Sequence, residues 1–110
     1  MIDPLNLDSR LVRLAVELFG KERNFNHTQE ECAELIVAIN HYRRGRISAE
    51  EVVEEIADVY IMCQCMAQIV GTNLVDQKIL EKSQIIRDYI TKELELKTAD
   101  ALLGSDEPSL

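Results

Sequence analysis

The sequence predicts an all-α protein: a four-helix bundle unit whose central antiparallel helix pair carries two acidic motifs. Apolar residues recur three and four positions apart through most of the chain, which is the spacing of an amphipathic helix. No useful stretch alternates apolar and polar residues with the period of two that a strand would show. Gly20, Gly45 and Gly71 separate the helical segments. A chain of 110 residues is long enough for one domain with a core of its own.

The first predicted helix begins after Asp8 or Ser9, either of which can cap it, and ends at Gly20. A polar connector is expected over residues 21–27. The apolar stripe of this first helix comprises Leu11, Leu14, Ala15 and Leu18.

Two capping boxes predict where the central helices start. Residues 28–31 (TQEE) open the second helix, which ends at Gly45 after two arginines that suit the negative end of a helix dipole. Residues 48–51 (SAEE) open the third helix, which runs to about Gly71.

The fourth helix is capped by Thr72 or Asn73 and fades after Leu96. Beyond it the sequence becomes small, polar and acidic, which is typical of disorder. We therefore expect a single domain over residues 1–97 and a disordered acidic tail over residues 98–110.

The composition excludes several classes of protein. With 12 basic and 20 acidic residues, and a net charge of −8, the chain has no broad basic face for nucleic acid. No run of apolar residues is long enough for a membrane span. Three cysteines do not form a secreted disulfide framework, and residues 1–4 lack the features of a signal peptide. We expect a soluble, cytoplasmic protein.

One acidic motif is written twice: residues 30–35 (EECAEL) return as residues 54–59 (EEIADV). At about 100° per residue, the second and last acid of each copy fall on or beside the apolar stripe of their helix. Carboxylates are rarely buried without a partner, so these positions require an explanation. The acids on the stripes are Glu31, Glu34, Glu55 and Asp58.

An antiparallel helix pair folded about Gly45 brings these four carboxylates to the same level on facing surfaces. Such a group repels itself unless a cation lies between its members. Ligand sets made only of oxygen suit Mg²⁺ or Mn²⁺, and the absence of a histidine at ligand spacing argues against zinc. Neither copy carries the Glu-x-x-His pair of a di-iron bundle. The sequence therefore predicts a Mg²⁺ site, with Mn²⁺ as the other candidate.

The paired motif, Glu30-Glu31-x-x-Glu34 followed by Glu55-x-x-Asp58, resembles the MazG-like branch of the all-α NTP pyrophosphatase superfamily over about residues 10–95. The resemblance implies an enzyme, a Mg²⁺-dependent hydrolase that cuts a nucleoside triphosphate between its α and β phosphates. The products would be a nucleoside monophosphate and pyrophosphate, and the role would be cleansing of the nucleotide pool. It also implies a homo-oligomer, either a dimer or a tetramer.

The resemblance further implies residue roles. Glu31, Glu34, Glu55 and Asp58 would bind the metal, and Glu30 would orient or deprotonate water. In such proteins the last helix also holds phosphates, and here Lys78 and Lys82 are the candidates. Lys82 departs from the family pattern, because relatives often have Asn there. Either lysine is equally well read as a surface residue whose stem covers apolar area.

Structural explanations compete with these assignments. Glu31 also fits the reciprocal acid of the Thr28 capping box, and His27 in a connector is typical of a solvent-facing histidine. The basic residues near Gly45, His41 among them, are typical of helix-end charges. Two other functions stay open: a non-catalytic bundle that binds metal or nucleotide, and an acidic helical module that binds a basic partner.

Overall fold

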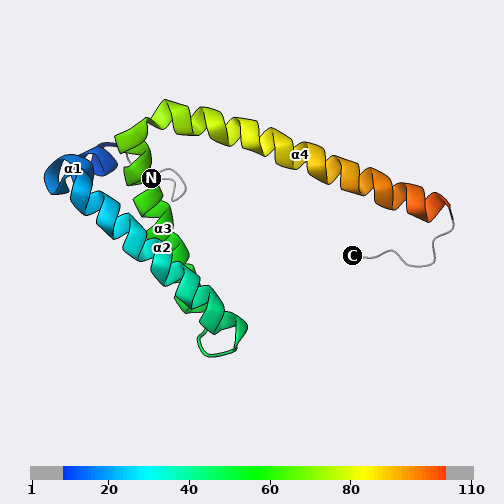
Figure 1. The fold of residues 1–110 in the computed structure, drawn as a ribbon, viewed down its shortest axis with the longest axis horizontal. Coiled ribbons are helices and arrows are strands. Elements are labelled where there is room, and N and C mark those ends of the chain that lie inside the picture. The colour runs from blue at the N-terminus through cyan, green and yellow to red at the C-terminus, as the bar shows by residue number, and fades with distance from the viewer. Residues whose placement is uncertain (1–8, 104–110) are drawn as a thin grey trace. The chain divides into compact units, whose positions relative to one another are not determined.

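A computed structural model describes residues 9–103, and almost all of them are helical (Figure 1). The predicted all-α class is confirmed, and the described residues contain no strand. The chain divides after Thr72 into two compact units, the first holding three helices and the second holding the fourth. The helices are α1 (Ser9–Phe19), α2 (Lys21–Arg43), α3 (Ala49–Val70) and α4 (Thr72–Leu102).

In the first unit, α2 and α3 form an antiparallel hairpin, and α1 packs against both of them (Figure 1). Val12 of α1 forms a buried cluster with Met62 and Cys65 of α3, and Ala15 and Val16 pack against this cluster. Burial of these apolar side chains fixes α1 on the hairpin. This cluster is small and involves only the part of the hairpin that α1 covers.

The turn of the hairpin is set by the backbone. The N–H of Arg46 donates to the carbonyl of His41 at 2.9 Å, and the N–H of Gly45 donates to that of Tyr42 at 3.0 Å. This pair of bonds is a Schellman motif, which needs a left-handed residue just past the helix end. Gly45 supplies it with φ of +71°. The helix therefore ends where the sequence predicts, and α3 can return directly alongside α2.

The predicted start of the second helix is wrong, because α2 begins at Lys21 and includes the residues expected to form a connector. Gly20, with φ of +83°, is the only residue between α1 and α2. Its N–H donates to the carbonyl of Val16 at 2.9 Å, and its own carbonyl accepts the N–H of Asn24 at 3.2 Å. One glycine thus ends one helix and starts the next.

Thr28 explains why the capping box misled the prediction. Its hydroxyl donates to the carbonyl of Asn24 at 2.7 Å, one turn back within the same helix. The Asn24 side-chain amide in turn donates to the carbonyl of Gly20 at 2.7 Å. Polar side chains that bond back to the preceding turn are compatible with a helix interior. The polar segment is therefore the first two turns of α2.

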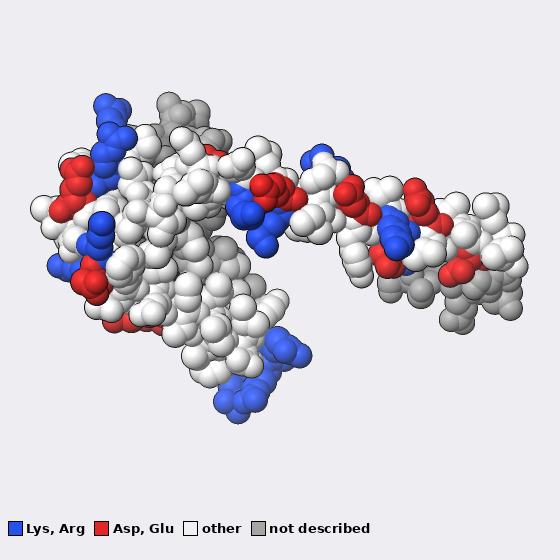
Figure 2. Space-filling view, turned by 45° about the horizontal axis from the view of Figure 1, so that its top comes forward, with Lys and Arg blue, Asp and Glu red and all other residues white. Residues whose placement is uncertain are grey.

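The second unit, α4, is 31 residues long and continues to Leu102, beyond the predicted end at Leu96. It therefore includes residues 98–102 of the predicted tail, while residues 104–110 lie outside the described residues. None of its residues is buried, and acidic and basic side chains alternate along its surface (Figure 2). No helix in the described part of the chain combines the length and apolarity needed to cross a bilayer.

Candidate functional site

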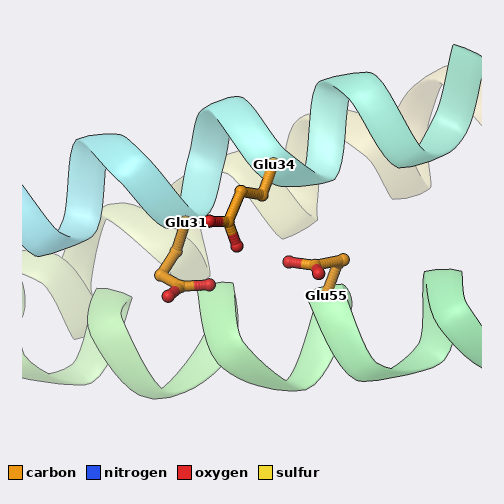
Figure 3. A group of neighbouring side chains, drawn as sticks. All are labelled: Glu31, Glu34 and Glu55. Carbon is orange, nitrogen blue, oxygen red and sulfur yellow. The ribbon is translucent and has the colours of Figure 1, made fainter.

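Three acidic side chains of the hairpin converge between its helices. Glu31 and Glu34 extend from α2 towards α3, and Glu55 extends from α3 towards them (Figure 3). One carboxylate oxygen from each residue lies within 4.8 Å of the other two. The structure thus brings together three of the four residues predicted to bind a metal. The helical wheel and the antiparallel hairpin explain why, since both motifs face the same seam at the same level.

Two of these carboxylates are poorly satisfied. Oε2 of Glu31 and Oε2 of Glu55 are buried, and neither has a hydrogen-bond partner within the described residues. A buried carboxylate oxygen without a partner is costly, because it has lost water and gained nothing in exchange. A divalent cation is a ligand that would satisfy both oxygens at once. The donor set, made only of carboxylate oxygens, fits Mg²⁺ or Mn²⁺.

The electrostatics of the cluster agree with this geometry. Burial raises the pKa of Glu31 above its ordinary value, and the negative charges of Glu34 and Asp58 raise it further. Burial also raises the pKa of Glu55, and the charges of Glu34, Asp58 and Glu31 add to the effect. Each acid is therefore held in a field that favours either a proton or another cation.

Asp58, the fourth predicted ligand, lies beside this group rather than among its mutually close oxygens. Its charge raises the pKa of both Glu31 and Glu55, so it contributes to the same negative field. With His27 and Glu31 it lines a small cavity of about 90 Å³, whose lining also includes Ile61 and Met62. Asp58 is exposed.

The sequence interpretation favoured a solvent-facing residue for His27, but the structure places it against the cluster. Its Nε2 lies 3.0 Å from Oε1 of Glu31, one helical turn away. The side chain of Glu31 is 14% exposed and that of His27 is 55% exposed, so the imidazole covers one edge of a mostly buried carboxylate. The four-residue spacing between His27 and Glu31 is visible in the sequence. It indicates a contact only if both residues lie on one helix, and residues 21–27 were predicted to be a connector.

The three other predicted site residues each have their own surroundings. Glu30 lines a separate open depression with Arg23, Asn26 and His27, so it shares the motif but not the face of its neighbours. Lys78 and Lys82 are exposed on α4, within the second unit. Nζ of Lys78 lies 2.7 Å from Oε2 of Glu81 on the same helix.

An apolar pocket of about 350 Å³ adjoins the acidic cluster, and the sequence did not reveal it. Glu34 and Glu55 form part of its wall, so the pocket and the cluster are continuous. His41, read from the sequence as a helix-end charge, is half-buried in the lining. The pocket extends from the acids towards the hairpin turn, where basic side chains gather at the lower end of the view in Figure 2. Its remaining walls include Val37, Ala38 and Ile47.

The comparisons with known proteins identify the family. A model of the MazG nucleotide pyrophosphohydrolase domain matches residues 19–88, which reach from the last residue of α1 into α4. The chain belongs to the MazG nucleotide pyrophosphohydrolase family, and the resemblance found from the paired acidic motif is confirmed. Members of this family generally depend on a divalent metal. Comparison with curated proteins gave no significant match. Comparison with solved structures gave none either.

Proposed function

We propose that this protein is a Mg²⁺-dependent nucleoside triphosphate pyrophosphohydrolase. Water would be added across the α–β phosphoanhydride, giving a nucleoside monophosphate and pyrophosphate. The observation that carries the proposal is the convergence of Glu31, Glu34 and Glu55, two of which have buried oxygens without a partner. Membership of the MazG family supports the same activity.

Four acids would hold the cation in this proposal: Glu31 and Glu34 from α2, and Glu55 and Asp58 from α3. The buried oxygens of Glu31 and Glu55 that have no hydrogen-bond partner, and the repulsion among the acids, favour binding of Mg²⁺. Mn²⁺ prefers the same oxygen ligands. When bound, the ion would neutralise charge on the phosphate oxygens and lower the pKa of a coordinated water. By holding the ion between the two helices, the four acids would determine where the phosphate oxygens bind.

Glu30 and the two lysines of α4 also have proposed roles, which rest on the resemblance to the family. We assign Glu30 the orientation or deprotonation of the attacking water, a role that rests on its place as the leading acid of the family motif. Lys78 and Lys82 would bind phosphate oxygens. The contact between Lys78 and Glu81 joins side chains that are 62% and 53% exposed. Exposed ion pairs contribute little, so exchanging Glu81 for a phosphate costs little.

The nucleoside would occupy the pocket that adjoins the cluster. A volume of about 350 Å³ lies within the range of small-molecule sites. Because Glu34 and Glu55 form part of the wall, a triphosphate held by the acids would place its nucleoside end among the apolar side chains. The His41 ring offers a surface on which a base can stack.

We also propose that the protein assembles as a homo-oligomer, a dimer or a tetramer, in the cytoplasm, where it cleanses the nucleotide pool. Large apolar side chains are exposed on every described helix of the hairpin unit; Leu14 is 60% exposed and Ile36 is 62% exposed. Exposed apolar area of this extent favours burial against a second copy. Light scattering coupled to gel filtration measures the number of chains.

The test is release of pyrophosphate from a panel of ordinary and modified nucleoside triphosphates in Mg²⁺. We expect Glu34→Gln and Asp58→Asn to reduce kcat/KM by at least about a hundredfold, as loss of charge stabilisation at a reaction centre does. Glu54→Gln is the matched control, because Glu54 shares the motif and is exposed. Activity that survives both site substitutions would overturn the assigned site.

The same experiment separates the two other functions. Binding of Mg²⁺ and nucleotide without turnover by the wild type would indicate a non-catalytic sensor. If Mg²⁺ had no effect on the thermal stability and replacement of the acids raised it, the protein would be an acidic interaction module.

A further inference from the structure

His27 and Glu31 form a contact that is unlike an ordinary pair on a helix surface. Their side chains meet at 3.0 Å, four residues apart on α2, and that of Glu31 is only 14% exposed. By contrast, the ion pair of Lys78 with Glu81 on α4 joins two groups that are both more than half exposed. His27 is itself 55% exposed, but it contacts a carboxylate that has little access to water, so the contact restricts that carboxylate more than it would on an open helix face.

The contact makes the two oxygens of Glu31 inequivalent. When Glu31 is ionised, as a metal ligand must be, its carboxylate can only accept hydrogen bonds, so Nε2 of His27 must then carry the hydrogen and donate it to Oε1. Oε2 is buried and has no hydrogen-bond partner in the described part of the chain. One oxygen is thus held by the protein, and the other is left for a ligand.

We propose that His27 is a positioning residue of the metal site: by holding Oε1 of Glu31, it fixes the carboxylate so that Oε2 faces the cation. This inference rests on the proposed function, since it assumes that Glu31 binds a metal. Groups that hydrogen-bond to a metal ligand fix its orientation, and losing one typically weakens metal binding by about 10- to 100-fold.

The surroundings of the pair support this role. His27, Glu31 and Asp58 form the polar side of the 90 Å³ cavity, and Ile61 and Met62 form its apolar side. At about 30 Å³ per water molecule, the cavity has room for very few small ligands. Only the polar lining residues can coordinate such a ligand or hydrogen-bond to it, so a fixed orientation of Glu31 affects where it binds.

The test is the affinity for Mn²⁺, measured on the purified full chain by calorimetry and by the electron paramagnetic resonance signal of the free ion. We expect His27→Ala to weaken Mn²⁺ binding by about 10- to 100-fold. His27→Gln should remain within about threefold of the wild type, because its amide N–H reaches the same distance and also donates to Oε1. Gln29→Ala, an exposed residue on the same helix, is the matched control and should leave the affinity unchanged.

Kinetics distinguish positioning from direct action on water. For His27→Ala we expect the Mg²⁺ concentration at half-maximal rate to rise while kcat at saturating Mg²⁺ stays near that of the wild type. A fall in kcat with unchanged metal affinity would overturn the proposal, and so would equal losses of affinity in folded His27→Ala and His27→Gln.

Failure of this inference differs from failure of the proposed function. If His27→Ala binds Mn²⁺ like the wild type while Glu34→Gln does not bind it, only the role of His27 is wrong. If the wild type itself binds no Mn²⁺, the metal site and the role of His27 are both overturned.

Discussion

Glu34 of α2 and Glu55 of α3 face each other across the hairpin, with carboxylate oxygens within 4.8 Å (Figure 3). The charge of Glu34 is one cause of the raised pKa of Glu55, second only to burial. The pair therefore opposes hairpin closure when both acids are ionised and favours it when a cation lies between them. Binding of a cation at this site would therefore be coupled to hairpin stability through these two residues.

Metal removal is the first consequence to test. A ligand present at about 100 times its Kd stabilises a fold by about 2.7 kcal/mol. We expect saturating Mg²⁺ at neutral pH to raise the Tm by several degrees over the protein in EDTA. In Glu55→Gln this shift should be lost, because one ligand and its charge are gone. Thermal unfolding followed by circular dichroism measures both. An equal shift in the variant would mean that Mg²⁺ binds elsewhere.

The pH dependence without metal follows from the raised pKa of Glu31 and Glu55. The folded state binds protons more tightly than the unfolded chain, in which the pKa of a glutamate is near its ordinary value of 4.5. This contribution to stability is fully present below about that pH and is lost as pH rises through the folded pKa values. Replacing Glu55 by Gln should therefore stabilise the metal-free protein more at pH 8 than at pH 5.

Urea unfolding in EDTA across this pH range measures the difference between Glu55→Gln and the wild type. Taking the difference cancels the titration of carboxylates remote from the cluster, so what remains comes from Glu55 and from the acids whose charges act on it. A difference that does not change with pH would contradict the electrostatic account of the cluster.

The acidic cluster was predictable because two regular properties determine it. Helical spacing places both acids of a motif near one face, and the glycine at the turn sets which levels meet across the hairpin. Glu31, Glu34 and Glu55 could therefore be brought together from the sequence alone. The position of Asp58 at the edge, rather than inside the group, depends on side-chain direction, which a helical wheel does not resolve.

The contact between His27 and Glu31 was missed because a local signal was misread. Residues 28–31 have the composition of a capping box, but Gly20 already provides the break that starts α2. Thr28 then bonds to the turn before it instead of capping the helix. The pocket around His41 was missed for another reason, since its walls come from two helices and the turn, and only packing brings them together.

Replacing His41 tests the nucleoside pocket. We expect His41→Ala to raise the KM for nucleoside triphosphate by about tenfold, because stacking of a base on an aromatic ring contributes about 1–3 kcal/mol. Metal affinity should stay unchanged, since the acids are intact. Asn40→Ala is the control: Asn40 is exposed, and its side chain bonds to the carbonyl of Ile36 on the same helix. A loss of metal affinity in His41→Ala would contradict a role limited to the nucleoside.

Gly45 tests how far the site depends on the hairpin turn. Its φ of +71° is left-handed, and an added Cβ would meet nothing within 4 Å, so the cost of Gly45→Ala comes from the backbone alone. We expect a loss of about 1 kcal/mol in the free energy of unfolding, measured in urea, because a side chain disfavours this conformation. Gly45→Asn should lose less, since asparagine tolerates left-handed backbone better. The folded fraction of both variants should bind Mn²⁺ like the wild type, because the Schellman bonds from Gly45 and Arg46 remain. If Gly45→Ala weakened Mn²⁺ binding without destabilising the fold, the turn would set the level of the acids more directly than the packing of α2 against α3 does.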